Sequence, residues 1–186
     1  MSRTRRGAGF SGLLDVDRAT PDGSVASLQS LWQKILEQFV APLCTTFGFD
    51  SIQNEDGIAR IDCFEYWQPP LVGTCRTTFR WTTPARGEVT AEESYALFRC
   101  DAEVAGLLSE VQIDHWAIND PGFPADRLYF HAGERLLLRV EPFELSLQFH
   151  GLTDDELDVL TDVDPELWPA LREVPGSVTS EVDTLE

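Results

Sequence analysis

The residue types best suited to catalysis or metal binding lie in one stretch of the chain, DRLYFHAGERLLLRVEPFELSLQFHG, from Asp126 to Gly151. It contains two of the three histidines, His131 and His150, among arginines and carboxylates. Histidine and carboxylate side chains bind metal ions and transfer protons near neutral pH. The same stretch has the alternating apolar pattern of β-strands. It is therefore either a metal or catalytic site or a well-patterned piece of sheet.

The predicted registers of two hairpins in this stretch help to choose between these interpretations. A three-residue loop that ends at Gly133 pairs Leu128 with Leu136, and the next turn pairs Leu138 with Leu147. The large apolar pairs then share one face of the sheet, as a correct register requires. The pattern therefore favours a three-stranded antiparallel meander.

The opposite face of the predicted meander carries polar side chains. In this register His150 neighbours Arg135, and a permanently charged guanidinium beside an imidazole opposes the binding of a metal cation. We therefore expect no metal, no cofactor and no catalytic residue here. Arginines can instead bind a carboxylate or phosphate through paired hydrogen bonds. The candidate binding residues are Arg127, Tyr129, Arg135, Arg139, Gln148 and His150.

The alternative for this polar face is an ordinary solvated sheet surface. Its arginines would then pair with local carboxylates or lie under a helix, and they would bind no ligand.

A second place for acid–base chemistry is the loop that contains Asp114 and His115. No serine or cysteine nucleophile motif accompanies it, and a histidine held in a packed loop is the simpler interpretation. The segment Gly7–Gly12 formally matches G-x-G-x-x-G, but no strand precedes it, as a dinucleotide site requires. The chain also lacks a P-loop and an HExxH motif, so an enzyme is the weaker hypothesis.

The four cysteines, Cys44, Cys63, Cys75 and Cys100, include no C-x-x-C pair. Structural zinc sites usually contain such short local pairs, so we expect free thiols in a reducing compartment. No apolar run approaches the roughly 20 residues that cross a membrane, and the start of the chain lacks the apolar core of a secretory signal. These features predict a cytoplasmic protein.

The formal net charge is −18, and the acidic residues are concentrated after Gly151, where Arg172 is the single basic residue. Such a field repels nucleic acids and anionic lipids, so we expect neither as a direct partner. The acidity has three explanations: solubility, a salt-adapted proteome, which the single lysine Lys34 would also suit, or a surface for a basic protein partner.

Periodicity predicts an α+β fold, with one domain whose sheet is mainly antiparallel and packed with a few helices. The sheet would combine an N-terminal hairpin, a third strand and the C-terminal three-strand meander. Residues 1–25 are predicted to form a flexible arm, 26–174 the domain and 175–186 an acidic flexible tail. The expected elements are a helix over 28–40, strands over 57–67, 74–81 and 94–100, a helix over 102–110, the meander within 126–150, and short helices after Gly151.

Two functional hypotheses follow. The first is a non-enzymatic, acidic cytoplasmic binding protein, in its concrete form an inhibitor or immunity-type protein that binds a basic protein. The alternative is a small ligand-binding domain or enzyme that uses the arginine-bearing sheet face or the Asp114–His115 loop.

Overall fold

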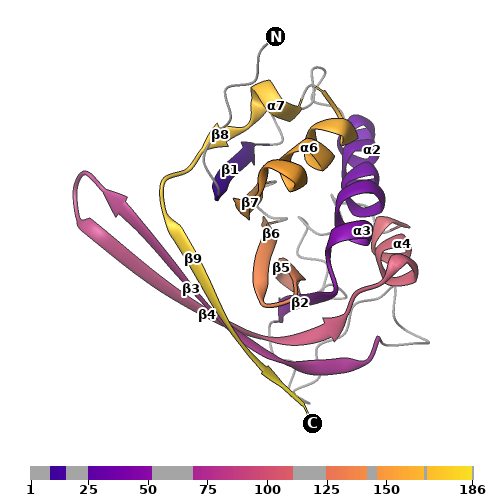
Figure 1. The fold of residues 1–186 in the computed structure, drawn as a ribbon, viewed down its shortest axis with the longest axis horizontal. Helices are drawn as coiled ribbons and strands as arrows, with labels where there is room; N and C mark the ends of the chain where they lie inside the picture. The colour runs from indigo at the N-terminus through magenta and orange to yellow at the C-terminus, as the bar shows by residue number, and fades with distance from the viewer. Residues whose placement is uncertain are drawn as a thin grey trace.

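A computed structural model describes residues 9–15, 25–51, 69–110, 125–141, 146–165 and 167–185. Within these ranges all the strands join one antiparallel sheet, and helices pack on one of its faces (Figure 1). The predicted α+β class with an antiparallel sheet is confirmed at this level. None of the described helices is both long and apolar enough to cross a membrane.

The sheet has nine strands in the order β8-β1-β7-β6-β5-β2-β4-β3-β9. The strands are β1 Phe10–Asp15, β2 Thr46–Ser51, β3 Leu71–Thr83, β4 Gly87–Arg99, β5 Ala125–Ala132, β6 Arg135–Glu141, β7 Ser146–Leu152, β8 Arg172–Glu173 and β9 Ser177–Thr184. The helical segments are α2 Val25–Ile35, a π-helix η1 Leu36–Val40, α3 Ala41–Leu43, α4 Ala102–Glu110, α6 Asp154–Val163 and α7 Leu167–Ala170.

The sheet curls until its two edges approach each other. Strands β8 and β9 lie at opposite edges of the sheet, yet only Val174, Pro175 and Gly176 separate them in the sequence. A chain of that length spans at most about 14 Å, so the edges must come close at this point. The curl creates a concave face, which the edge strand β9 borders, and a convex face, which carries the helices (Figure 1).

The convex face is buried under the amphipathic helix α2 and its π-helical continuation. Trp32 packs against Phe130 with ring centroids 6.3 Å apart, and Phe39 meets Phe149 edge-on at 5.6 Å. These side chains are almost completely shielded from solvent. The predicted helix over 28–40 is present, although it begins at Val25 and continues through η1 and α3.

The concave face holds a second, smaller apolar cluster. Cys75, Phe79, Tyr95, Tyr129 and Leu136 belong to it, and β9 contributes partly buried valines. The Tyr95 and Tyr129 rings are stacked, with centroids 3.8 Å apart. Alternation along the strand 74–81 predicts that Cys75 and Phe79 share one face, and both are buried in the structure.

The predicted hairpin partner of strand 74–81 was the segment 57–67, which lies outside the described residues. In the described part of the chain this strand pairs instead with the expected third strand, across a turn at 84–86. The resulting β3–β4 hairpin is much longer than predicted, and its end projects from the body (Figure 1).

Both ends of the chain differ from the prediction. β1 lies within the segment 1–25 that was predicted to be a flexible arm, and it pairs with β7 and β8. β9 lies within the segment 175–186 that was predicted to be a flexible tail, and it pairs with β3 over its whole length. Neither segment has a strong pattern of its own, so these pairings depend on the edges that the rest of the sheet offers.

The C-terminal meander is present, but its registers were predicted wrongly. Leu128 pairs with Val140 and not with Leu136, because a two-residue turn at Gly133-Glu134 joins β5 to β6 and a bulge near His131 shifts the register by one further residue. The β6–β7 register is also shifted, by two residues. Both shifts are even, which preserves the faces of most residues. The bulge near His131 is the exception, because it turns Leu136 to the concave cluster.

Candidate functional site

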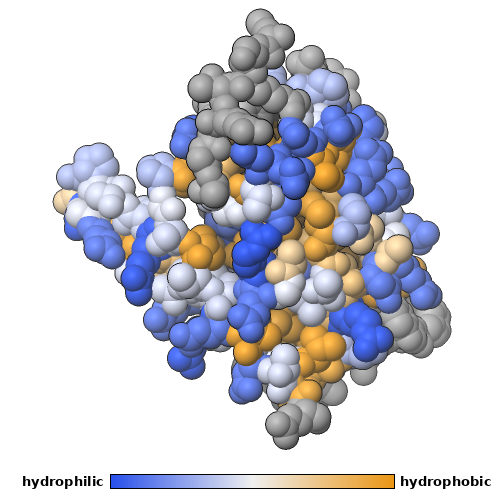
Figure 2. All heavy atoms as spheres, viewed as in Figure 1, coloured by the Kyte–Doolittle hydropathy of each residue, from blue (hydrophilic) through white to orange (hydrophobic). Residues whose placement is uncertain are grey.

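A half-open cavity of about 370 Å³ lies on the concave face. It is lined by the β3–β4 hairpin on one side, by β1 and the β8–β9 connection on the other, and by β6 and β7 at its base. Figure 2 shows a notch between the projecting hairpin and the body, with apolar surface beside it. The cavity exists because the sheet curls and the helices fill only its convex face.

The wall of the cavity is apolar. Phe79 and Trp81 contribute from β3, Val178 from β9, and Val174 and Pro175 from the β8–β9 connection. Trp81 is 36% exposed and Val174 38%, which makes them two of the more exposed large apolar residues. They mark the opening, so an apolar ligand would gain contacts as it enters.

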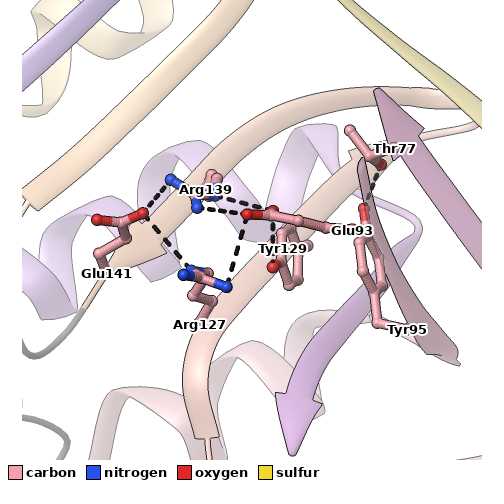
Figure 3. Close-up of polar contacts among 7 residues, drawn as sticks. All are labelled: Thr77, Glu93, Tyr95, Arg127, Tyr129, Arg139 and Glu141. Atoms are coloured by element: carbon pink, nitrogen blue, oxygen red, sulfur yellow. Dashed lines mark hydrogen bonds and ion pairs between the residues drawn. The ribbon is translucent and has the colours of Figure 1, made fainter. Parts of the chain in front are cut away.

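The floor of the cavity is a network of ion pairs and hydrogen bonds (Figure 3). Arg139 contacts Glu93 through two hydrogen bonds of 2.7 and 3.2 Å and also pairs with Glu141. Arg127 bridges the same two carboxylates, with N···O distances of 3.6 Å to each. The Tyr129 hydroxyl donates to Glu93 at 2.9 Å. Two arginines and two glutamates therefore cancel in charge and hold one another in place.

The network keeps Arg139 charged in spite of its burial. Burial alone lowers the pKa of Arg139, but the hydrogen bonds and negative charge of Glu93, with that of Glu141, raise the pKa above its ordinary value. The guanidinium also lies 5.1 Å from the centre of the Phe79 ring, within the range of a cation–π contact. The floor and the apolar wall are therefore in direct contact.

Two further candidate residues line this cavity, Gln148 and His150. Gln148 lies opposite Arg139 in the β6–β7 ladder. Its amide makes no side-chain hydrogen bond within the described ranges, although the neighbouring Arg139 makes several. Gln148 is partly exposed, so this amide remains available as both a donor and an acceptor.

His150 differs from Gln148 because its polar atom is shielded. Its ring lies 5.7 Å from that of Phe79, and its Nε2 is buried with no hydrogen-bond partner among the residues that the structure describes. Burial lowers the pKa of His150 to about 3, and the positive charge of Arg139 acts in the same direction. The histidine is therefore neutral, and the arginine beside it is Arg139 and not the predicted Arg135.

Arg135 lies apart from the floor. It pairs with Glu156 and donates to the carbonyl of Gly151 at 3.2 Å, so it helps to dock the first turn of α6. The sequence spacing of Thr153 and Glu156 predicts a capping box at the start of that helix. The structure confirms it, since the Thr153 side chain and Glu156 cap each other's backbone N–H groups. Arg135 is thus committed to joining the helix to the sheet.

The second histidine of the stretch, His131, lies away from the cavity in a buried chain of hydrogen bonds. Its Nε2 is 2.7 Å from the Tyr95 hydroxyl, which is 2.8 Å from the hydroxyl of Thr77, which in turn contacts Ser180 at 3.1 Å. Burial lowers the pKa of His131 to about 4. The chain ties β9 to β3, β4 and β5, which indicates a structural role.

The structure therefore brings five of the six candidate residues to one place. Arg139, Gln148 and His150 line the cavity, while Arg127 and Tyr129 do not line it but contact Glu93, which does. Each of the three arginines has a carboxylate partner, as expected for the alternative in which local acids neutralise them.

Sequence reasoning missed the two acidic partners, Glu93 and Glu141, and the apolar wall. Alternation along β4 offered one signal, because Glu93 shares a strand face with the buried Tyr95 and Leu97. A carboxylate on a buried face requires a cationic partner. No comparable signal indicated that Trp81 would lie opposite Val174.

The other candidate groups give less support for a functional site. Asp114, His115 and Cys63 lie outside the described residues. Cys44, Cys75 and Cys100 are free and buried, and burial raises the pKa of Cys100 to about 12, so its thiol is unreactive. Over the described ranges, no group of three or more histidine, cysteine or acidic side chains is arranged to hold a metal ion.

Comparisons of the chain with protein-family models, with curated proteins and with solved structures found no match.

Proposed function

We propose that this protein is a small-ligand-binding domain whose ligand occupies the concave-face cavity. The observation that carries the proposal is the cavity itself, which combines an apolar wall, an exposed apolar opening and an ordered polar floor. Small-molecule sites typically have this composition, with few polar groups in a mainly apolar hollow. Its volume of about 370 Å³ suits a compact ligand.

The floor supports binding more than catalysis. Glu93, Glu141, Arg127 and Arg139 are engaged with one another, and their hydrogen bonds fix their positions before any ligand arrives. A site that is ordered in advance loses less conformational entropy on binding. Each carboxylate is engaged by an arginine, which supports a positioning role for the floor.

A fragment screen monitored by two-dimensional NMR tests the proposal. Ligands of this site should shift the signals of Gly176, Val178 and His150, and Trp81→Ala should weaken their binding at least tenfold. Leu71→Ala is the matched control, because Leu71 is another exposed apolar residue of β3 that does not line the cavity. Hits that bind equally well to both variants, or no hits at all, would refute the proposal.

The acidic surface favours a second candidate function, the binding of a basic protein partner in the cytoplasm. In α6, Asp154, Asp155 and Asp162 are exposed, while Glu156 of the same helix is engaged by Arg135. A cluster of exposed, negatively charged carboxylates accelerates association with a cationic surface.

This candidate predicts capture of one stoichiometric partner from a lysate of the native host at low ionic strength. The capture should be lost at high salt and in the triple variant Asp154→Asn, Asp155→Asn, Asp162→Asn, because screening or removal of the carboxylates weakens the attraction. The Trp81→Ala variant should retain the partner. A partner that the triple variant still binds would exclude this surface.

A further inference from the structure

We infer that the ligand of the concave-face cavity is an uncharged molecule with a flat apolar body and a carboxamide-like group that pairs with Gln148. This inference rests on the proposed function and specifies the chemical class of the ligand. It depends on three features: the charge balance of the floor, the free amide of Gln148 and the aromatic wall.

The charge balance disfavours an ionic ligand. An anionic group could bind Arg139 only by displacing Glu93 or Glu141, and the displaced carboxylate would remain in a poorly hydrated site without its partner. A cationic group would meet the same obstacle in reverse, because both glutamates already bind arginines. An uncharged ligand leaves the network intact.

Arg80, which also borders the cavity, does not change this balance. It lies between Phe79 and Trp81 on β3, so strand alternation directs its side chain to the opposite face. Its contribution is its main chain, which Gly176 approaches closely. A Cβ added at Gly176 would lie 2.7 Å from the Arg80 carbonyl oxygen, so glycine is needed where the β8–β9 connection closes the cavity.

Gln148 is a polar lining group whose partly exposed amide has no side-chain partner among the described residues, whereas the unpartnered Nε2 of His150 is shielded. Its side chain offers an N–H donor next to a carbonyl acceptor. Another carboxamide presents the complementary pair, and two hydrogen bonds can form side by side. Arg139, its neighbour in the ladder, cannot serve this purpose because Glu93 and Glu141 occupy it.

The wall sets the shape of the apolar body. The Phe79 ring contacts the Arg139 guanidinium and lies 5.7 Å from the His150 ring, and Trp81 lies near the opening. Aromatic ligands gain from offset or edge-on contacts with such rings. The volume of about 370 Å³ lies at the lower end of the range for ligand sites, which fits a body of one or two fused rings.

Three probes of nearly identical shape test the inference: 2-naphthamide, 2-acetonaphthone and 2-naphthoate. They present a donor with an acceptor, an acceptor alone, and a negative charge, respectively. Calorimetric titration of the intact chain near neutral pH should give the tightest binding for the amide. We expect the methyl ketone to bind about tenfold more weakly, which corresponds to one lost hydrogen bond. The carboxylate should bind more weakly still.

Variants of Gln148 assign the preference to that residue. Gln148→Leu should bind the amide and the ketone equally. Gln148→Glu keeps the side-chain shape but offers only acceptors, so it should still bind the amide N–H while losing the hydrogen bond to the ketone oxygen. Both variants must retain the circular dichroism spectrum of the original protein. An amide preference that persists in folded Gln148→Leu would overturn the role of Gln148.

The remaining outcomes separate this inference from the function on which it rests. Tighter binding of 2-naphthoate than of 2-naphthamide would overturn the uncharged class, although the cavity would still be a binding site. If none of the three probes binds but other fragments shift the cavity signals, the chemical class alone is wrong. If no fragment binds the cavity either, both the inference and the proposed function fail.

Discussion

The two faces of the curled sheet are filled in different ways. The convex face is covered by α2, η1, α4 and α6, and its large side chains are nearly all inaccessible to solvent. The concave face has a smaller apolar cluster, a charged network and an open cavity. Convex packing is driven by burial of apolar area, whereas the concave face depends on polar groups that satisfy one another. This contrast places most of the apolar burial on one face and the open cavity on the other.

The largest change in the free energy of unfolding is expected when a large side chain is removed from the core on the convex face. Phe39 is fully buried and contacts Phe149 edge-on. Phe39→Ala should lower the free energy of unfolding by about 3–5 kcal/mol, because it removes apolar contacts and leaves a void. Urea denaturation measures this change. An effect below about 1 kcal/mol would contradict the assignment of the convex face as the main stabilising core.

The next largest effect should come from the floor of the cavity. Arg139→Met removes one of the two arginines that neutralise Glu93 and Glu141, and we expect a loss of about 3 kcal/mol in the free energy of unfolding. The double variant Arg139→Met, Glu93→Gln should be more stable than the single one, because one unpaired charge is removed. A double-mutant cycle on urea midpoints checks this, and additive effects would exclude coupling between Arg139 and Glu93.

The histidines His131 and His150 predict that the free energy of unfolding depends on pH. The pKa of His131 is about 4 and that of His150 about 3 in the folded protein, against 6.5 for an unperturbed histidine. The folded state therefore resists protonation while the unfolded chain takes up protons. Stability should be constant above pH 7 and should fall as the pH drops through 6.5 towards 4. Between pH 7 and pH 5 the loss should be about 2 kcal/mol for His131.

Denaturation curves at several pH values measure this loss, and His131→Gln is the matched variant. Glutamine can still bond to the Tyr95 hydroxyl but cannot be protonated, so its stability should depend less on pH over this interval. An unchanged pH dependence in His131→Gln would show that His131 is not the group responsible.

The smallest effect concerns the helix cap where the sheet joins α6. Thr153 accepts a hydrogen bond from the Glu156 backbone N–H, and the Glu156 side chain accepts one from the Thr153 backbone N–H. Thr153→Ala should cost about 1 kcal/mol. Ser11→Ala, which removes a single exposed hydrogen bond to the Gly151 N–H, should cost less and serves as the comparison. Equal losses would show that the reciprocal cap adds nothing.

The features that were predicted correctly are local, because they depend on residues that are close together in the sequence. The amphipathic helix before Pro42, the capping box at Thr153 and the strand alternation around Phe79 follow from side-chain spacing. The candidate residues were also identified from such spacing, because alternation alone assigns a strand residue to one face.

The registers were predicted less well because several pairings satisfy the same pattern. A shift of two or four residues leaves each apolar side chain on its face, so alternation cannot distinguish Leu136 from Val140 as the partner of Leu128. The bulge that turns Leu136 to the concave cluster has no local signature either. These choices depend on how the whole sheet packs.

The sequence by itself therefore determined the α+β class, the antiparallel meander and the polar face that contains Arg127, Arg139 and Gln148. Tertiary structure decided that β1 and β9 join the sheet, and that its edges meet at Val174–Gly176. It also decided that Glu93 and Glu141 neutralise the arginines and that an apolar wall faces them across a cavity. The physical reason is separation in sequence. Side-chain spacing determines structure over a few residues, whereas the curl of the sheet and the pairing of charges depend on strands that are far apart in the chain.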